Sequence, residues 1–90
     1  MICYINKQGD GFILDPSNIL SIAHWKISKG DAKEKIIITD KYQRDTIIEW
    51  VPVEYCHCFI KFLLQYMMFT STYEPLQWSD FENYKKEQIQ

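Results

Sequence analysis

The chain has 90 residues, a formal net charge of -2 and an apolar share of 47%. This length corresponds to a single domain, residues 1–90, and the apolar share excludes an intrinsically disordered chain. The slight negative charge argues against strong attraction to nucleic acid or to an anionic membrane.

Two short strands are expected at the start of the chain, over residues 2–6 and 12–14. The segment between them contains Gly9 and Gly11, and glycines at such a place favour the tight turn of a β-hairpin. The first residues carry neither a basic stretch nor a small-residue cleavage site, so we expect no signal peptide.

Three further strands are expected over residues 19–28, 35–40 and 46–51. Isoleucine is frequent in them, as is typical of strands, and polar segments separate them. These segments are too short to hold a crossover helix, so neighbouring strands should pair antiparallel as a meander. The sequence therefore predicts an antiparallel sheet of four to five strands within residues 1–51.

One long helix is expected over residues 53–69, directly after Pro52, which suits the first turn of a helix. Thirteen of its 17 residues are apolar, and its polar side chains form one narrow stripe. The stripe consists of Glu54, His57, Lys61 and Gln65. A helix this apolar needs cover on at least two sides. We expect the sheet on one side and either the C-terminal segment or another protein on the other.

The C-terminal segment, residues 73–90, is expected to contain a short helix that begins at Ser79, because Ser79 and Glu82 have the spacing of a capping box. The predicted fold is therefore α+β, with a sheet, one long buried helix and a short C-terminal helix. Large aromatic rings stand out in the last segment, and two interpretations of them stay open. They fold back and cover the long helix, or they bind a partner protein or a second copy of the chain.

The expected partner-binding residues are the rings of this segment and two residues of the helix stripe, namely Trp78, Phe81, Tyr84, Tyr73, His57 and Lys61. Trp and Tyr are the residue types that most often carry interface energy. A domain of this size also has little room for a substrate cleft. We therefore expect a non-enzymatic protein-binding module of the regulator or inhibitor kind. A phage or mobile-element protein that blocks a host enzyme, for instance a nucleic-acid-guided defence nuclease, fits this description.

An alternative function is the binding of single-stranded RNA or DNA through a lysine-rich hairpin, residues 25–44. Lysines next to aromatic rings are typical of such surfaces. The residues concerned are Trp25, Lys26, Lys29, Lys33, Lys35, Lys41, Tyr42 and Arg44. Acidic residues lie among them, and a solvated hairpin whose lysines protect a sheet edge is the preferred interpretation.

The sequence Cys56-His57-Cys58 has residue types that bind metals, but successive helical residues point about 100° apart. Cys56 and Cys58 therefore diverge and cannot bind one ion together. A distant residue, such as Cys3 or His24, would have to join one of them. We expect two buried thiols, with no metal ion and no cofactor.

His57 lies three residues after Glu54, a spacing that suits either a proton relay or a solvated polar stripe. No nucleophile accompanies the pair, so we expect no catalytic residues and prefer a stripe that faces a partner. His24 is expected to be an exposed strand residue.

The cysteines and the apolar segments indicate where the protein acts. Three cysteines match no disulfide framework, which suits a reducing compartment. The apolar run 58–69 is too short to cross a bilayer and contains Lys61 and Gln65. We therefore expect a cytoplasmic protein with no membrane partner.

Overall fold

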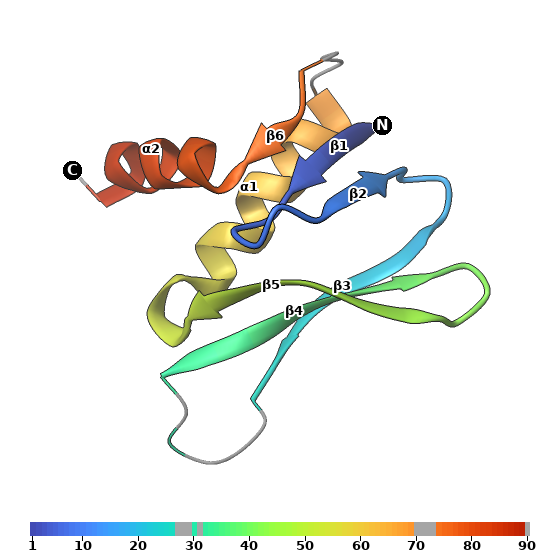
Figure 1. The fold of residues 1–90 in the computed structure, drawn as a ribbon, viewed down its shortest axis with the longest axis horizontal. Helices are drawn as coiled ribbons and strands as arrows, with labels where there is room; N and C mark the ends of the chain where they lie inside the picture. Colours follow the sequence, from blue (N-terminus) through green and yellow to red (C-terminus); the bar gives the residue numbers. More distant parts are fainter. Residues whose placement is uncertain (27–29, 31, 70–73, 90) are drawn as a thin grey trace.

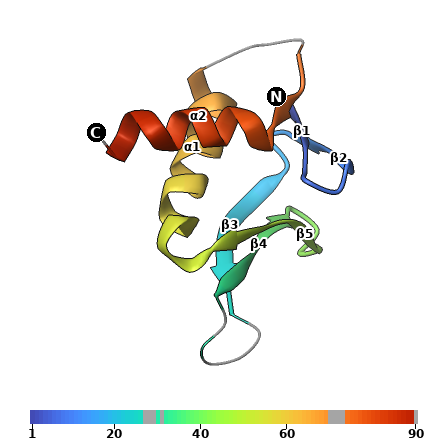
Figure 2. The ribbon, with the colours of Figure 1, turned by 60° about the vertical axis from the view of Figure 1, so that its left-hand side comes forward.

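The computed structural model describes residues 1–26, 30, 32–69 and 74–89. The fold is α+β, as predicted, with six strands in two three-stranded sheets where the sequence suggested one sheet of four to five strands. The two helices lie to one side of the sheets (Figures 1 and 2).

The first sheet has the strand order β2-β1-β6, with β1 (Ile2–Ile5) in the middle. β1 pairs antiparallel with β2 (Gly11–Leu14), which confirms the predicted hairpin. Gly9 in the turn has a φ of 91°, a left-handed conformation that other residues rarely adopt. The third strand, β6 (Leu76–Gln77), pairs parallel with β1. A strand of two residues is too short to show an alternating pattern, so β6 could not be predicted from the sequence.

The second sheet is the predicted meander, with the order β3-β4-β5. Its strands are β3 (Ile19–Trp25), β4 (Lys33–Asp40) and β5 (Asp45–Pro52), all antiparallel. Side chains alternate between the faces of a strand. In β4 the buried positions are Glu34, Ile36 and Ile38, so a carboxylate occupies a core-facing position of the central strand.

A second buried carboxylate joins the two sheets. A register shift in the pairing of β4 with β5 leaves both Ile48 and Glu49 buried on β5. The Glu49 carboxylate accepts hydrogen bonds from the Tyr4 hydroxyl at 2.7 Å and from the Lys7 backbone N–H at 3.1 Å. Burial and this bond to Glu49 raise the pKa of Tyr4, so the hydroxyl stays protonated and remains a donor. The first sheet is thereby fixed to the edge of the second.

The long helix begins as a short 3-10 turn, Val53–Tyr55, and continues as α1 (Cys56–Phe69). Both predicted covers are present. The second sheet packs on one side of α1, and α2 (Trp78–Ile89) crosses the other side (Figure 2). Phe59, Phe62 and Leu63 of α1 are fully buried between them.

α2 begins at Trp78, one residue before the predicted start. The Asp80 carboxylate accepts the backbone N–H of Gln77 at 2.8 Å, and the Trp78 indole donates to Glu82 at 2.8 Å. Phe81 is fully buried, with its ring centroid 5.0 Å from that of Phe59. These contacts confirm the interpretation in which the C-terminal rings cover the long helix.

Among the described residues, no helix combines the length and the apolar character needed to cross a membrane.

Candidate functional site

A polar cluster lies where α1 begins, between the helix and the second sheet. It brings together His24 from β3, Glu34 from β4 and Cys56 from the first turn of α1. One metal-ligating atom from each residue lies within 4.8 Å of those of the other two. Glu34 and Cys56 are buried, and the side chain of His24 is 30% exposed.

The central group of this cluster is the Glu34 carboxylate. His24 Nδ1 makes a short contact with Glu34 Oε2, and the Cys56 sulfur lies within 4.8 Å of the same carboxylate. The thiol also lies 3.5 Å from the carbonyl oxygen of Val51 and 3.6 Å from that of Pro52. Three elements distant in sequence are thus joined through one buried charge.

Burial acts on the two acidic groups of the cluster with different results. Burial by itself would raise the pKa of Glu34, but the bonds from His24 and Cys56 and the nearby positive charge hold that pKa below its usual value. Burial and the adjacent Glu34 carboxylate raise the pKa of Cys56 to about 12. The thiol is therefore protonated at neutral pH and a poor nucleophile in this environment.

The predicted properties of the histidines change in this setting. His24 is not a freely exposed strand residue, because it is half-buried against Glu34. Its ring also contacts the ring of His57, with centroids 4.8 Å apart and nearly perpendicular planes. His57 is exposed at this end of the helix stripe.

As expected from helix geometry, Cys56 and Cys58 do not lie in the same cluster, because Cys56 is close to His24 and Glu34 and Cys58 is not. A metal site was expected to need a distant residue, such as Cys3 or His24, beside one of the two thiols. In the structure both His24 and Glu34 lie beside Cys56. One feature of the sequence could have indicated that Glu34 is buried. An acidic residue at an alternating position before Ile36 and Ile38 interrupts an apolar strand face.

The opposite end of α1 carries an apolar groove. It lies between the second half of the helix and the start of β3 and has a volume of about 270 Å³. The residues that line it are Pro16, Ile19, Leu20, Ser21, Ile22, Ile60, Leu64, Met67 and Met68. Nearly all of them are apolar, so the groove has few groups that could orient a polar ligand.

Three large side chains of this groove are open to solvent. Leu20 is 61% exposed, Leu64 is 41% exposed and Met68 is 67% exposed. A shallow hollow beside the groove is lined by Leu64 and Met68 together with Lys61, Gln65 and Tyr84. Two of the predicted partner-binding residues, Lys61 and Tyr84, therefore border the exposed apolar side chains.

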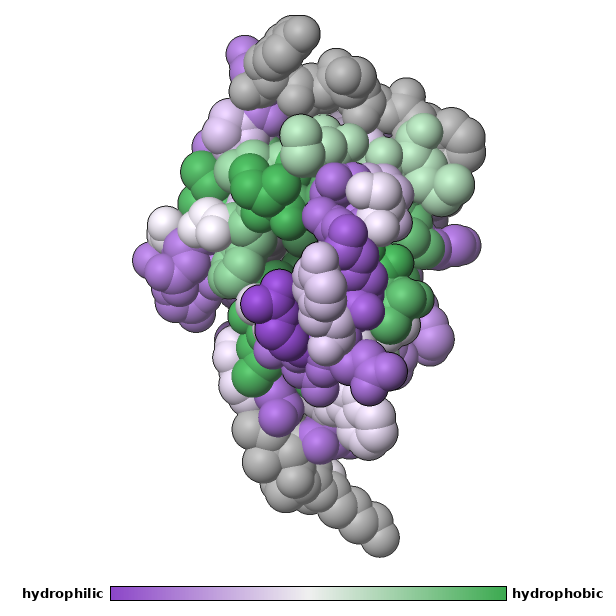
Figure 3. Space-filling view, turned by 90° about the vertical axis from the view of Figure 1, so that its right-hand side faces the viewer, coloured by the Kyte–Doolittle hydropathy of each residue, from purple (hydrophilic) through white to green (hydrophobic). Residues whose placement is uncertain are grey.

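Other exposed apolar side chains are Ile13 on β2 and Met1, which precedes β1. Figure 3 shows the side of the molecule where the β2–β3 connection and the β4–β5 turn lie. Hydrophobic side chains gather there on both sides of a central hydrophilic strip (Figure 3). This face is therefore divided, whereas the α1–β3 groove is hollowed and is lined almost entirely by apolar side chains.

The remaining predicted partner-binding residues lie elsewhere. Phe81 corrects the expectation, because a fully buried ring in the core cannot reach a partner while the protein is folded. Trp78 is half-buried, and Lys7 Nζ lies 4.1 Å from the centroid of its indole ring. Tyr73 lies outside the described residues. The five described residues among the six therefore do not form one surface.

The lysine-rich segment 25–44 is divided by the structure. Trp25, Lys26, Lys33 and Lys35 lie near the end where β3 passes into β4, whereas Lys41, Tyr42 and Arg44 form the turn between β4 and β5. The eight residues of β4 separate these two groups by roughly 20–25 Å. Lys29 lies outside the described residues. The described basic residues therefore do not form one continuous platform.

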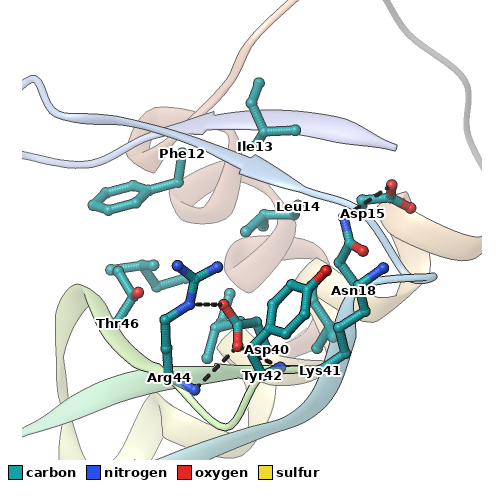
Figure 4. Close-up of a pocket in the computed structure, with 13 residues that line it drawn as sticks. Phe12, Ile13, Leu14, Asp15, Asn18, Asp40, Lys41, Tyr42, Arg44 and Thr46 are labelled. Carbon is teal, nitrogen blue, oxygen red and sulfur yellow. Dashed lines mark hydrogen bonds and ion pairs between the residues drawn. The ribbon is translucent and has the colours of Figure 1, made fainter.

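A cavity of about 420 Å³ lies between β2 and the β4–β5 turn. Figure 4 shows Phe12 and Leu14 on one side of it, with Tyr42 and Arg44 on the other. The Asp40 carboxylate accepts the Arg44 Nε–H at 2.9 Å and the backbone N–H groups of Tyr42 and Arg44. These bonds hold the pKa of Asp40 below its usual value. The charged groups are thus satisfied by the turn itself.

Comparisons with protein-family models, with curated proteins and with solved structures returned no match. The function has to be inferred from the geometry of these sites.

Proposed function

We propose that the protein is a non-enzymatic protein-binding module whose α1–β3 groove receives an apolar segment of a partner protein. The observation that carries this proposal is the exposure of Leu20, Leu64 and Met68 around one groove. The sheet and α2 bury Phe59, Phe62, Leu63 and Met67, so among the described side chains of α1 the exposed large apolar ones are Leu64 and Met68.

The side chains of the groove favour a peptide segment over a small polar ligand. Methionine is unbranched and flexible, so Met67 and Met68 can adapt to the side chains of a bound segment. An amphipathic helix inserts its apolar face into grooves of this kind. Lys61 lies on the rim, so the occupant that fits best is an amphipathic helix with a carboxylate at the edge of its apolar face.

Within this proposal the protein acts in the cytoplasm as a small regulator or inhibitor. Support for the compartment comes from Cys3, Cys56 and Cys58, which are all free thiols. Support for the mode of action comes from size, because a chain of 90 residues acts most simply by occupying a surface of another protein. A phage or mobile-element origin, with a host defence nuclease as the target, remains one form of the proposal.

The proposal is tested by affinity capture from the native host with the wild-type chain and with the double variant Leu64→Ser, Met68→Ser. Lys86→Ser, an exposed change on α2, is the matched control. We expect one protein to be retained by the wild type and by the control but not by the double variant. Capture of the same protein by all three chains would contradict the proposal.

The mass of the purified protein in solution separates a foreign partner from a second copy of the chain. A monomer is expected. A dimer that dissociates in the Leu64→Ser, Met68→Ser variant would show that the groove binds a second copy, and the proposed foreign partner would then be wrong.

A further inference from the structure

We propose that His24, Glu34 and Cys56 bind a zinc ion at the junction of β3, β4 and α1. This inference is independent of the proposed protein-binding function, because the groove lies at the other end of α1. From the sequence alone, His24 was expected to be an exposed strand residue and Cys56 a buried thiol, and no role was predicted for Glu34.

The three donor atoms lie close enough together to bind one ion. An imidazole nitrogen, a carboxylate oxygen and a thiol sulfur lie within 4.8 Å of one another. Tetrahedral zinc with bonds of about 2.0–2.3 Å separates its ligand atoms by roughly 3.5 Å. Metal binding therefore requires the contact between His24 and Glu34 to open, and a donor separation as long as 4.8 Å to shorten by about 1 Å.

The donor atoms of His24, Glu34 and Cys56 are of types that zinc binds. Nitrogen from His, oxygen from Glu and sulfur from Cys are the three ligand types that zinc accepts in proteins. A set with one donor of each type suits a borderline-soft ion such as zinc better than calcium or magnesium, which prefer oxygen alone. Three protein ligands leave a fourth position for water, and the partly exposed His24 ring marks the side open to solvent.

A bound cation would also compensate the buried negative charge of Glu34. Glu34 is only 5% exposed, and an ionised carboxylate at a core-facing strand position is costly to bury. An isoleucine there would continue the apolar face of Ile36 and Ile38. A divalent cation bound by the Glu34 carboxylate, the Cys56 thiolate and a neutral His24 imidazole gives a complex with no net charge. Such a complex removes the cost of the buried charge.

Binding changes the protonation of the cluster in a defined way. The Cys56 thiol gives its proton to solvent as the sulfur bonds to the ion. His24 binds through Nδ1, and its imidazole then carries a single proton on Nε2. The Glu34 carboxylate exchanges its hydrogen bonds for a bond to the ion. One proton is therefore released from the thiol for each ion bound.

The test uses Co²⁺ as a spectroscopic probe and Zn²⁺ as the competing ion, with the reduced full-length protein. We expect one equivalent of Co²⁺ to give visible bands of a tetrahedral site and an ultraviolet thiolate-to-cobalt band. Zn²⁺ should displace the cobalt with a one-to-one end point. Absence of the thiolate band, or a zinc titration without a stoichiometric end point, would overturn the proposal.

The two helix thiols provide matched variants. Cys56→Ser should lose the thiolate-to-cobalt band, and Cys58→Ser should keep it, because Cys58 points away from the cluster. The opposite pattern would assign the metal to another site and refute this one. Cys56 is fully buried, so folding of its variant is to be checked by circular dichroism.

Two further variants keep the test decisive if Cys56→Ser does not fold. Glu34→Gln and His24→Gln retain the size and polarity of their residues but remove a metal ligand. Each should weaken zinc binding at least about tenfold, and zinc should raise the Tm of the wild type more than that of either variant. Unchanged zinc affinity in both variants would show that the ion binds elsewhere.

Discussion

The two ends of α1 differ in what the fold places against them. At the beginning of the helix, β3 and β4 present His24 and Glu34 to Cys56, and a set of polar groups is buried. At the end of the helix, β3 presents Leu20 and Ile22 beside Leu64, and apolar groups are exposed. Each end thus departs from the simple rule that apolar side chains are inside and polar ones outside.

The difference teaches that one helix can combine a tight polar junction with an unfinished apolar surface. Between the two ends, Phe59, Phe62 and Leu63 form a continuous core with Phe81 of α2. This core supplies most of the hydrophobic stabilisation of the helix. The ends are therefore free to carry residues that do not maximise stability, and both of our proposals concern those ends.

The largest effect is expected at the core between the two ends. Phe81→Ala removes a fully buried ring that contacts both Phe59 and Phe62, so we expect a loss of about 3–5 kcal/mol in the free energy of unfolding. Urea denaturation measures it, with the exposed Asn83→Ala as the control on the same helix. A loss below about 1 kcal/mol would mean that α2 does not hold the two ends to a common core.

A smaller loss is expected at the polar end. Glu34→Gln should lower the free energy of unfolding at neutral pH, because a neutral amide cannot replace the bond of the buried carboxylate to His24. The native pKa of Glu34 is lowered. Its contribution is therefore present above the pKa of the unfolded chain and is lost as the pH falls through the native pKa.

The gap in stability between wild type and Glu34→Gln should accordingly narrow in acid. Urea denaturation at neutral and at acidic pH measures this gap. Glu54→Gln, an exposed change in the 3-10 turn before α1, is the control and should show little difference at either pH. A gap that stays constant with pH would remove the electrostatic account of the cluster.

The stability of the protein should also decrease at high pH because of Cys56. Its native pKa is raised from 9.0 to about 12, so above pH 9.0 the unfolded chain releases a proton that the native thiol retains. Wild-type stability should therefore fall over this range more steeply than that of Cys56→Ala. Thermal unfolding of both chains at several pH values checks the expectation, and parallel curves would contradict it.

The smallest effect on stability is expected at the apolar end. Leu64→Ser and Met68→Ser change exposed side chains, so each should alter the free energy of unfolding by no more than about 0.5 kcal/mol. The two ends would then differ clearly, since the polar end contributes to folding and the apolar end does not. A loss above about 2 kcal/mol would indicate that the groove closes on itself in solution.

Much of the fold follows from local pattern in the sequence. The hairpin at Gly9, the three isoleucine-rich strands and the helix that ends at Phe69 all lie where periodicity and turn residues placed them. The double cover of that helix also followed, because an apolar helix surface has to be removed from water. The narrow polar stripe is exposed along α1, as its spacing predicted.

Other features depend on contacts between distant segments. The attachment of the first sheet to the second rests on the bonds of Glu49 to Tyr4 and Lys7, which join residues 45 and 42 positions apart. The strand β6 exists only because β1 offers a free edge. Phe81 was expected both as a cover and as an anchor, and only packing against Phe59 decided that it belongs to the core.

By itself the sequence determined the class of the fold, the order of its main elements and the need to cover the long helix. Those features depend on neighbouring residues and on the period of the hydrophobic pattern. The tertiary structure alone decided that His24, Glu34 and Cys56 meet, and that Leu20 lies beside Leu64 and Met68. The reason is physical: which side chains meet across elements is set by strand register and helix docking, and neither leaves a local signal in the chain.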